Sequence, residues 1–272
     1  SQFGIIVNVD KCIGCQACFV ACKEENKVAP GIQWNQIHRA ENLQDRIINY
    51  FRVSCQHCDN PACLPVCPAK AIYKGPHGEV LVDQSKCIGC GACAMACPYG
   101  APKFNRSGKT SYWDVPALAS VPLRPHQQRT PGKAERCTLC VQRTSNGQVP
   151  KCVEACAVKA LTFVDYDNLT PEQKALVDKS VALNEAAGTK PKVRYIASYM
   201  DIAGRQEKIS NHRFSLIDKS GRGFDSRSDF FFRSFGNIPK GLELLRALGH
   251  IIEKLTFFNK IINKGFSGMS HL

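Results

Sequence analysis

The chain has 272 residues, of which 44% are hydrophobic and 22% charged, and its formal net charge is +13. Its length allows one or two domains with a buried core, and this composition argues against wholesale disorder. We find no apolar run of about 18 residues, which predicts no membrane-spanning helix, and residues 1–10 show no Sec-type signal. The positive charge alone would fit a nucleic-acid-binding protein, so the 16 cysteines have to be considered first.

In chain order, the cysteines form four groups of four, and each group lies beside a predicted strand. Group one follows a strand predicted at 5–7, and group two precedes one at 71–73. Group three follows a strand at 80–82, and group four precedes one at 160–163. The groups are Cys12, Cys15, Cys18 and Cys22; Cys55, Cys58, Cys63 and Cys67; Cys87, Cys90, Cys93 and Cys97; and Cys137, Cys140, Cys152 and Cys156.

The spacing of groups one and three, C-x2-C-x2-C-x3-C, favours iron–sulfur clusters over other states of cysteine. Disulfides stabilise small domains that lack a sufficient hydrophobic core, and a chain of this length does not need them for that purpose. A zinc site needs only two cysteines from each half-site, whereas three close thiolates and a fourth beyond them are the bacterial ferredoxin spacing. Zinc or mixed metals remain the alternative. The 16 thiolates supply four ligands to each of four 4Fe–4S clusters.

Residues inside and beside the groups agree with this prediction. Gly14 and Gly89 allow unusual backbone dihedrals that bring N–H groups close to inorganic sulfur. Pro68 and Pro98 follow the fourth cysteines of groups two and three, as in ferredoxins, although they would also end short helices. His57 lies inside group two, where four cysteines suffice, so we predict a hydrogen bond or a surface position for it. We find no nucleophile, phosphate-loop or dinucleotide motif and expect a non-catalytic protein.

Between and after groups three and four the chain changes character. Residues 101–136 are rich in Pro and Gly and predict a long loop, in which Tyr112-Trp113 is a candidate partner anchor or cluster cover. A capping box at Thr170 predicts a helix over 170–188. A strand is predicted within 192–199.

The last segment, residues 202–272, predicts a basic docking tail. It holds 12 Lys+Arg against 6 Asp+Glu. Apolar residues recur there at three- and four-residue spacing, which predicts an amphipathic helix over 241–263. Three uses of this helix remain open: packing on a neighbouring subunit, folding onto its own domain, or lying on a membrane surface.

The motifs resemble those of the four-cluster electron-transfer subunit of the complex iron–sulfur molybdoenzyme, or DMSO reductase, family. The resemblance covers roughly residues 4 to 200 and includes the residues between the cysteines as well as their spacing. The matching stretches are Cys12-Ile13-Gly14-Cys15 through Ala21-Cys22-Lys23-Glu24-Glu25-Asn26; Cys55-Gln56-His57-Cys58-Asp59-Asn60-Pro61-Ala62-Cys63; Cys87-Ile88-Gly89-Cys90 through Cys97-Pro98-Tyr99-Gly100-Ala101-Pro102; and Arg136-Cys137-Thr138-Leu139-Cys140.

The resemblance implies how the groups share their ligands, with group one paired to group four and group two to group three. The implied sets are Cys12, Cys15, Cys18 and Cys156 for cluster one; Cys22, Cys137, Cys140 and Cys152 for cluster two; Cys55, Cys58, Cys63 and Cys97 for cluster three; and Cys67, Cys87, Cys90 and Cys93 for cluster four. In the family, cluster one lies beside the catalytic subunit and cluster four nearest the membrane anchor.

The expected fold is α+β, with two nested bacterial-ferredoxin-like two-cluster modules, long loops, and a C-terminal extension ending in the amphipathic helix. The outer module comprises 1–54 and 137–168, and the inner module 55–100. The remaining divisions are the insertion 101–136, the helix and strand of 169–201, and the tail 202–272.

The resemblance implies a non-catalytic subunit that passes electrons between a molybdopterin catalytic subunit and a polytopic quinone-binding membrane anchor. Such a chain is peripheral on a membrane complex, on a face that stays open because family members can be exported with a twin-arginine partner. The alternatives are a free-standing polyferredoxin or hydrogenase-associated carrier, and a nucleic-acid-binding metalloprotein. Sixteen thiolates and four oxidised cubanes bring the net charge to about +5. We therefore expect no nucleic-acid partner.

Overall fold

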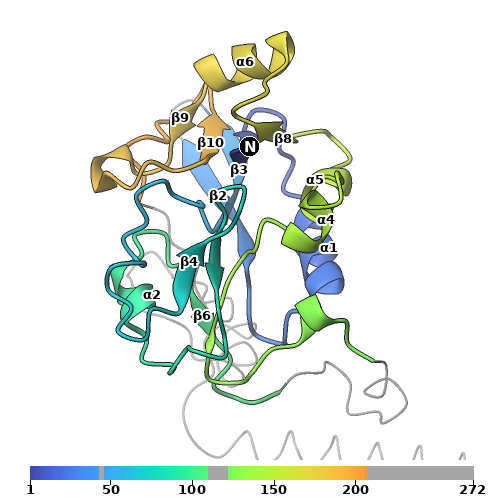
Figure 1. The fold of residues 1–272 in the computed structure, drawn as a ribbon. Helices are drawn as coiled ribbons and strands as arrows, with labels where there is room; N and C mark the ends of the chain where they lie inside the picture. Colours follow the sequence, from blue (N-terminus) through green and yellow to red (C-terminus); the bar gives the residue numbers. More distant parts are fainter. Residues whose placement is uncertain (43–45, 110–121, 207–272) are drawn as a thin grey trace, which may run out of the picture. The chain divides into compact units, whose positions relative to one another are not determined.

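The computed structural model describes residues 1–42, 46–109 and 122–206, which form a mixed α+β structure of short helices and strands (Figure 1). The α+β class expected from the sequence is confirmed. The amphipathic helix expected at 241–263 and the Tyr112-Trp113 pair lie outside the described residues.

A four-stranded sheet joins the start of the chain to distant segments, in the order β8-β1-β10-β9. Its strands are β1 (Phe3–Asn8), β8 (Leu161–Asp165), β9 (Val181–Ala182) and β10 (Val193–Ile196). Ile5 lies opposite Phe163 in antiparallel β8 and opposite Val193 in parallel β10. Because β1 leads into cysteine group one and β8 follows group four, this sheet brings the two groups together.

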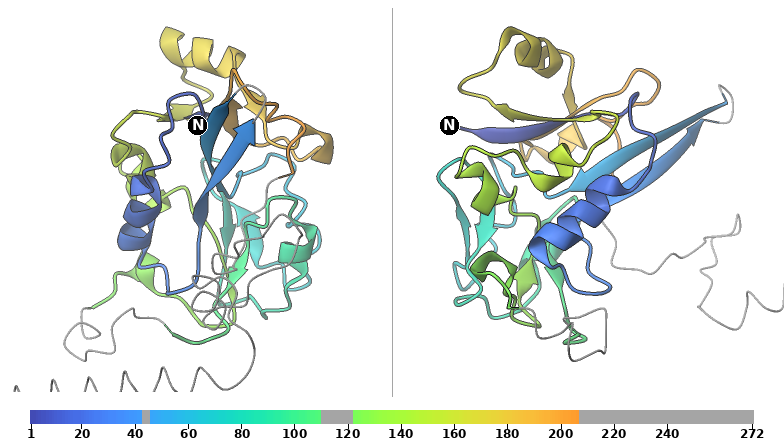
Figure 2. Two further views of the ribbon diagram at one scale, coloured as in Figure 1. Left: turned by 180° about the vertical axis from the view of Figure 1, so that it is seen from behind. Right: turned by 90° about the vertical axis from the view of Figure 1, so that its right-hand side faces the viewer.

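The helices beside the cysteine groups lie on two opposite sides of the described residues, whereas α6 (Pro171–Asp178) lies apart from them at the top of the view (Figures 1 and 2). On one side α1 packs against α5, with α4 close by. These helices are α1 (Ala17–Asn26), α4 (Val141–Thr144) and α5 (Lys151–Glu154). On the other side lie α2 and an antiparallel pair of strands. These elements are α2 (Ala92–Ala96), β4 (Ile72–Lys74) and β5 (Val80–Val82). Groups one and four therefore occupy one side, and group three with the end of group two the other.

A long hairpin lies between the two sides, and its second strand is the more buried. The hairpin pairs β2 (Asn35–Asn42) with β3 (Ile47–Ser54) along their full length. In β3, Phe51 and Val53 are fully buried in a core that also contains cysteines of all four groups. β-Branched and aromatic residues suit such a strand. The hairpin thus carries the chain from group one to group two through the core.

Two predictions about loops and helices need correction. The predicted helix over 170–188 is shorter: α6 (Pro171–Asp178) begins at the predicted capping box but ends ten residues early. Pairing of Val181–Ala182 with β10 replaces the helical hydrogen bonds, and the 3-10 turn η2 (Glu185–Ala187) follows. The insertion 101–136 is not loop alone, because β6 (Lys103–Phe104) pairs with β7 (Ala134–Glu135) and η1 (Pro125–Gln127) lies between them.

Candidate iron–sulfur centres

All sixteen cysteines are free, and twelve of them line three separate cavities. The first cavity is lined by Cys22, Cys137, Cys140 and Cys152. The second is lined by Cys55, Cys58, Cys63 and Cys97. The third is lined by Cys67, Cys87, Cys90 and Cys93. Each cavity takes cysteines from two of the sequence groups.

The remaining cysteines, Cys12, Cys15, Cys18 and Cys156, approach one another at the N-terminal end of α1. Burial is the main cause that raises the pKa of Cys12, and the thiols of Cys156 and Cys15 raise it further. The thiols of Cys12 and Cys156 act in the same direction on Cys18, whose pKa burial raises to about 12. Electrostatic effects of this kind require short distances. These four thiols therefore form a fourth neighbourhood.

The four neighbourhoods differ in exposure in a regular way. All cysteines of the first and second cavities are buried. Cys15 in the N-terminal neighbourhood and Cys90 in the third cavity are exposed. Burial raises the pKa of Cys55, and the thiol of Cys137 raises it further, which places the two buried cavities next to each other. The four thiol sets thus form a series in which the two end sets reach the surface and the two middle sets are buried.

The cavities fit a cubane cluster in donor type and in arrangement. Thiolate is a soft ligand that selects Fe–S clusters, zinc and copper(I). The four cysteines of each of these sets line a shared cavity, and in residues 1–42, 46–109 and 122–206 no group of three or more His, Cys, Asp or Glu is arranged to hold a single metal ion. A group with several metal atoms, bridged by its own sulfur, suits this arrangement better than one zinc ion.

Burial keeps the thiols neutral when no metal group is bound. It raises the pKa of Cys58 and Cys140 to about 12 and that of Cys93 to about 11. Metal ligation requires the thiolate form, so loading each set releases protons. Positive groups beside the thiols would favour that form. The chain therefore needs buried cations near these cavities.

Backbone N–H groups donate to the sulfur of the last cysteine in three of the four groups. Ala71, Ala101 and Ala160 donate to the cysteine four residues earlier, at N–Sγ distances of 3.3, 3.4 and 3.2 Å. The corresponding cysteine of group one is Cys22, which lies inside α1, where backbone N–H groups serve the helix. The Asn26 side chain takes this place, with Nδ2 3.8 Å from the sulfur of Cys22.

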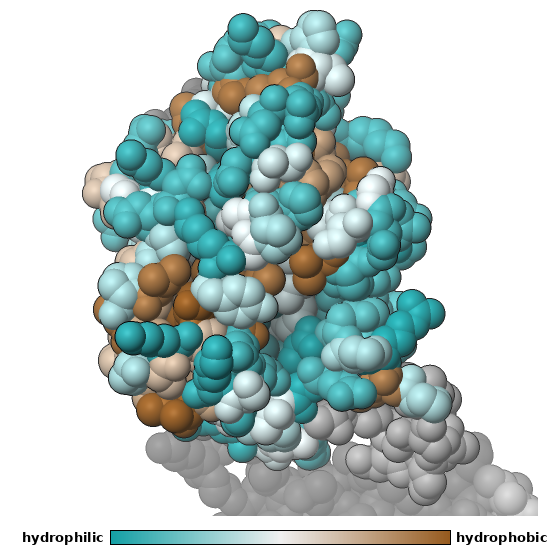
Figure 3. Space-filling model, in the orientation of Figure 1, coloured by the Kyte–Doolittle hydropathy of each residue, from teal (hydrophilic) through white to brown (hydrophobic). Residues whose placement is uncertain are grey.

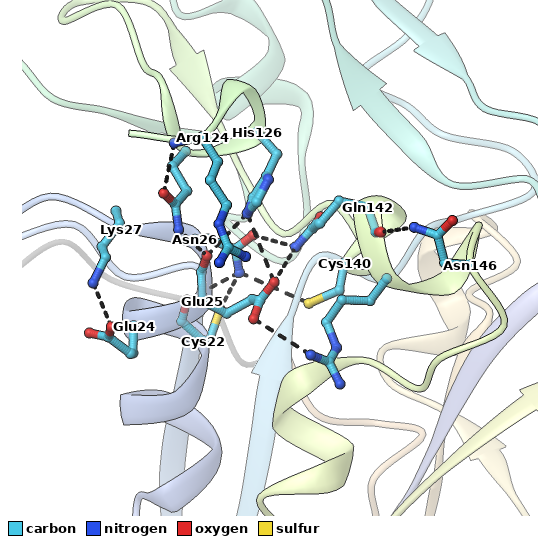
Figure 4. A network of polar contacts seen from close by, with 12 residues as sticks. Cys22, Glu24, Glu25, Asn26, Lys27, Arg124, His126, Cys140, Gln142 and Asn146 are labelled. Carbon is cyan, nitrogen blue, oxygen red and sulfur yellow. Dashed lines mark hydrogen bonds and ion pairs between the residues drawn. The ribbon is translucent and has the colours of Figure 1, made fainter. Parts of the chain in front are cut away.

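Asn26 also reaches the neighbouring segment, and Figure 4 shows how it is held. Its Nδ2 lies 4.0 Å from Cys140 Sγ and donates to the Cys22 carbonyl at 3.1 Å. The adjacent Glu25 accepts a hydrogen bond from Gln142 at 3.0 Å and lies 3.8 Å from His126 Nε2. These contacts tie α1 to α4 and η1 around the first cavity.

The cysteine loops and His57 differ in how well they match the sequence predictions. Gly14 and Gly89 have φ values of +72° and +74°, as the cysteine loops were expected to require. A Cβ at Gly14 would lie 2.7 Å from the Tyr50 ring, so a side chain does not fit there. His57 has no surface role, because it is fully buried, and its Nδ1 accepts a hydrogen bond from the Val80 N–H at 3.1 Å.

Two buried arginines beside the thiols were not predicted from the sequence. Arg52 lies on β3 and lines the first cavity, and Arg136 follows β7 and lines the second. Both are almost fully buried. The signal for Arg136 was its place directly before Cys137, whereas nothing in the β3 sequence distinguished Arg52 from a surface residue of a strand.

Among the described residues, no helix is long and apolar enough to cross a membrane.

Comparison with protein families supports cluster binding by these cysteines. A family model described as a 4Fe-4S dicluster domain matches residues 47–112 and again 113–166. The first match contains groups two and three, and the second contains group four. A dicluster domain holds two clusters, so two matches and 16 cysteines correspond to four 4Fe–4S clusters.

Three relatives match most of the chain. The arsenate respiratory reductase iron-sulfur subunit of Shewanella sp. (strain ANA-3) is 34% identical over 227 residues, or 73% of this chain and 97% of the relative. A component of the anaerobic dimethyl sulfoxide reductase of Escherichia coli (strain K12) is 33% identical over 204 residues, 71% of this chain and 87% of the relative. A component of the tetrathionate reductase of Salmonella typhimurium is 31% identical over 204 residues, 72% of each. This chain belongs to the family of non-catalytic iron–sulfur subunits that transfer electrons through 4Fe–4S clusters in reductases of the dimethyl sulfoxide reductase type.

Proposed function

We propose that this chain conducts electrons through four clusters whose ligands are shared between paired cysteine groups. Clusters one and two take the ligand sets Cys12, Cys15, Cys18 with Cys156, and Cys22, Cys137, Cys140 with Cys152. Clusters three and four take Cys55, Cys58, Cys63 with Cys97, and Cys67, Cys87, Cys90 with Cys93. The three cysteine-lined cavities and the N-terminal neighbourhood support these sets. The outer module is then 1–54 with 137–168, and the inner module 55–100.

The observation that carries this proposal is the exposure of Cys15 and Cys90 at the two ends of an otherwise buried series of thiols. Electrons can enter or leave only where a centre comes near the surface, and buried centres keep intermediate electrons from solvent oxidants. Clusters one and four are therefore the contact points for partners, and clusters two and three connect them. The chain's part is to supply thiolates, N–H donors and burial, which tune the potentials.

Exposed apolar side chains beside both end clusters support two docking faces. Ile13 is 62% and Val20 61% exposed beside the cluster one ligands. Ile88 is 68% and Met95 84% exposed beside the cluster four ligands. Figure 3 shows brown apolar surface on the side where α2 lies. Exposed apolar patches of this kind mark interfaces.

The names of three relatives, which assign them to arsenate, dimethyl sulfoxide and tetrathionate reductases, support a place for this chain in such a complex. A molybdopterin catalytic subunit contacts the cluster one end, and a quinone-binding membrane anchor contacts the cluster four end. The chain is then peripheral on a membrane-bound complex. Its substrate is a property of the catalytic partner.

Anaerobic purification of the full chain with its co-purifying subunits tests this function. We expect about sixteen iron atoms per chain and four one-electron centres in a potentiometric titration followed by electron paramagnetic resonance. A stable monomer with the same iron content would favour the free-standing carrier instead. A colourless chain with two or more zinc ions would refute cluster binding.

A further inference from the structure

Arg52 carries a charge into the space between two thiol sets. It is 1% exposed, and none of its three guanidinium nitrogens has a regular hydrogen-bond partner in the described part of the chain. It lines the cavity of the cluster two ligands. It also lowers the pKa of Cys18, a cluster one ligand, against the larger effect of burial. Arg52 therefore faces one set directly and acts on the next.

Arg136 has the same relation to the ligands of clusters three and four as Arg52 has to those of clusters one and two. It is 2% exposed, and its Nη1 donates to Cys63 Sγ at 3.2 Å, while Nε and Nη2 have no partner among the described residues. It lines the cavity of the cluster three ligands. It lowers the pKa of Cys93, a cluster four ligand, against the larger effect of burial.

A buried guanidinium without an anion is costly, and arginine cannot escape the cost by losing its proton. No carboxylate pairs with either arginine in the ion pairs of the described residues. Among the described residues, the anions that could neutralise either arginine are the thiolates of the ligand sets, together with the clusters that those thiolates would hold. A fixed positive charge close to a cluster stabilises its reduced, more negative form in a medium of low dielectric constant.

We propose that Arg52 and Arg136 are redox-tuning residues, each raising the reduction potentials of one pair of clusters: Arg52 of clusters one and two, and Arg136 of clusters three and four. This proposal rests on the ligand sets given above. It divides the four clusters into two independently tuned pairs that correspond to the two modules.

Arg52→Gln, Arg52→Lys, Arg136→Gln and Arg136→Lys in the full chain, purified anaerobically with its co-purifying subunits, test this role. The four midpoint potentials are measured by potentiometric titration with electron paramagnetic resonance. In Arg52→Gln we expect two clusters to become at least tenfold harder to reduce, a shift of about 59 mV for a one-electron couple. In Arg136→Gln we expect the same shift of the other two clusters.

The lysine variants and a control distinguish an effect of the arginine's charge from an effect of its packing. In each Lys variant, the midpoint potentials of the affected pair of clusters should shift from wild type by less than half as much as in the corresponding Gln variant. Arg39→Gln is the matched control, because Arg39 lies on the neighbouring strand β2 with a half-exposed side chain paired to Glu41 at 2.9 Å. Its charge is screened by water, and no potential should move.

The pattern of shifted clusters in the four arginine variants decides between support and refutation. Complementary pairs of shifted clusters support it, and so does a Gln variant that loses its pair of clusters while the Lys variant keeps them. Shifts of the same clusters in both Gln variants, equal shifts in Lys and Gln, or loss of clusters in both, would overturn it. A wild-type chain with fewer than four clusters would instead refute the ligand sets, whatever the arginine variants show.

Discussion

Two pairs of cysteines provide a sharp test of the ligand sets, because neighbours in the sequence are assigned to different clusters. Cys18 and Cys22 lie four residues apart on the same helix, α1. Cys152 lies in α5, and Cys156 follows that helix. We predict that Cys18→Ala and Cys156→Ala affect one cluster, and that Cys22→Ala and Cys152→Ala affect another.

The size of the effect follows from the number of ligands. The chain has 16 cysteines for four clusters, so no cysteine is left to replace a missing one. Cys18 and Cys22 are 8% and 5% exposed, which leaves little access for a solvent ligand. Each variant should fall from about sixteen iron atoms to about twelve if the cluster is lost, or to about fifteen if it becomes a three-iron cluster.

Iron analysis and electron paramagnetic resonance of the reduced chain measure both quantities. Val20→Ala is the control, since Val20 lies between Cys18 and Cys22 on α1 and is 61% exposed, and it should keep all four signals. The reasoning would be refuted if Cys18→Ala and Cys22→Ala changed the same signal, because the helix would then serve a single cluster.

Three further predictions concern residues around the clusters. Asn26→Leu removes the Nδ2 donor 3.8 Å from Cys22 Sγ and should make one of the four potentials more negative; an unchanged set of potentials would show that the amide does not act on the cluster. Tyr195→Phe removes a buried hydroxyl that donates to a carbonyl at 3.0 Å, which costs about 1–3 kcal/mol and should speed thermal bleaching about fivefold or more without changing the iron content. Burial raises the pKa of Tyr166 to about 12, so its contribution to stability is complete below about pH 10, the unfolded value, and is lost as the pH rises through 12. Tyr166→Phe should flatten this part of the pH dependence of bleaching, and a parallel curve would contradict the assignment.

Several elements of the fold were predictable because their signals are local. Strands beside the cysteine groups, such as β1 and β5, follow from short apolar runs, and the start of α6 follows from its capping box. The end of α6 was not predictable, because it depends on the pairing of β9 with the distant β10. Helix propensity after Asp178 is outweighed by hydrogen bonds that exist only in the folded sheet.

The candidate site shows the same division. Positive φ at Gly14 and Gly89 could be expected from glycines placed between the first two cysteines of their groups. The role of Asn26 could not, because it depends on α1 continuing through Cys22, so that a side chain replaces the backbone donor found in the other three groups. His57 could equally have been a surface residue until the contacts around it were known.

The sequence by itself determined the donor set, since four groups of closely spaced cysteines supply 16 thiolates and favour four 4Fe–4S clusters over zinc. Ligand spacing is a local property of the chain and survives any arrangement of the loops. Only the tertiary structure decided which thiols are exposed at the ends of the series and which are buried between them. It also decided that Arg52 and Arg136, far apart in the sequence, lie buried beside thiols of different sets. Burial and electrostatic surroundings depend on which distant segments pack together, and no local pattern encodes them.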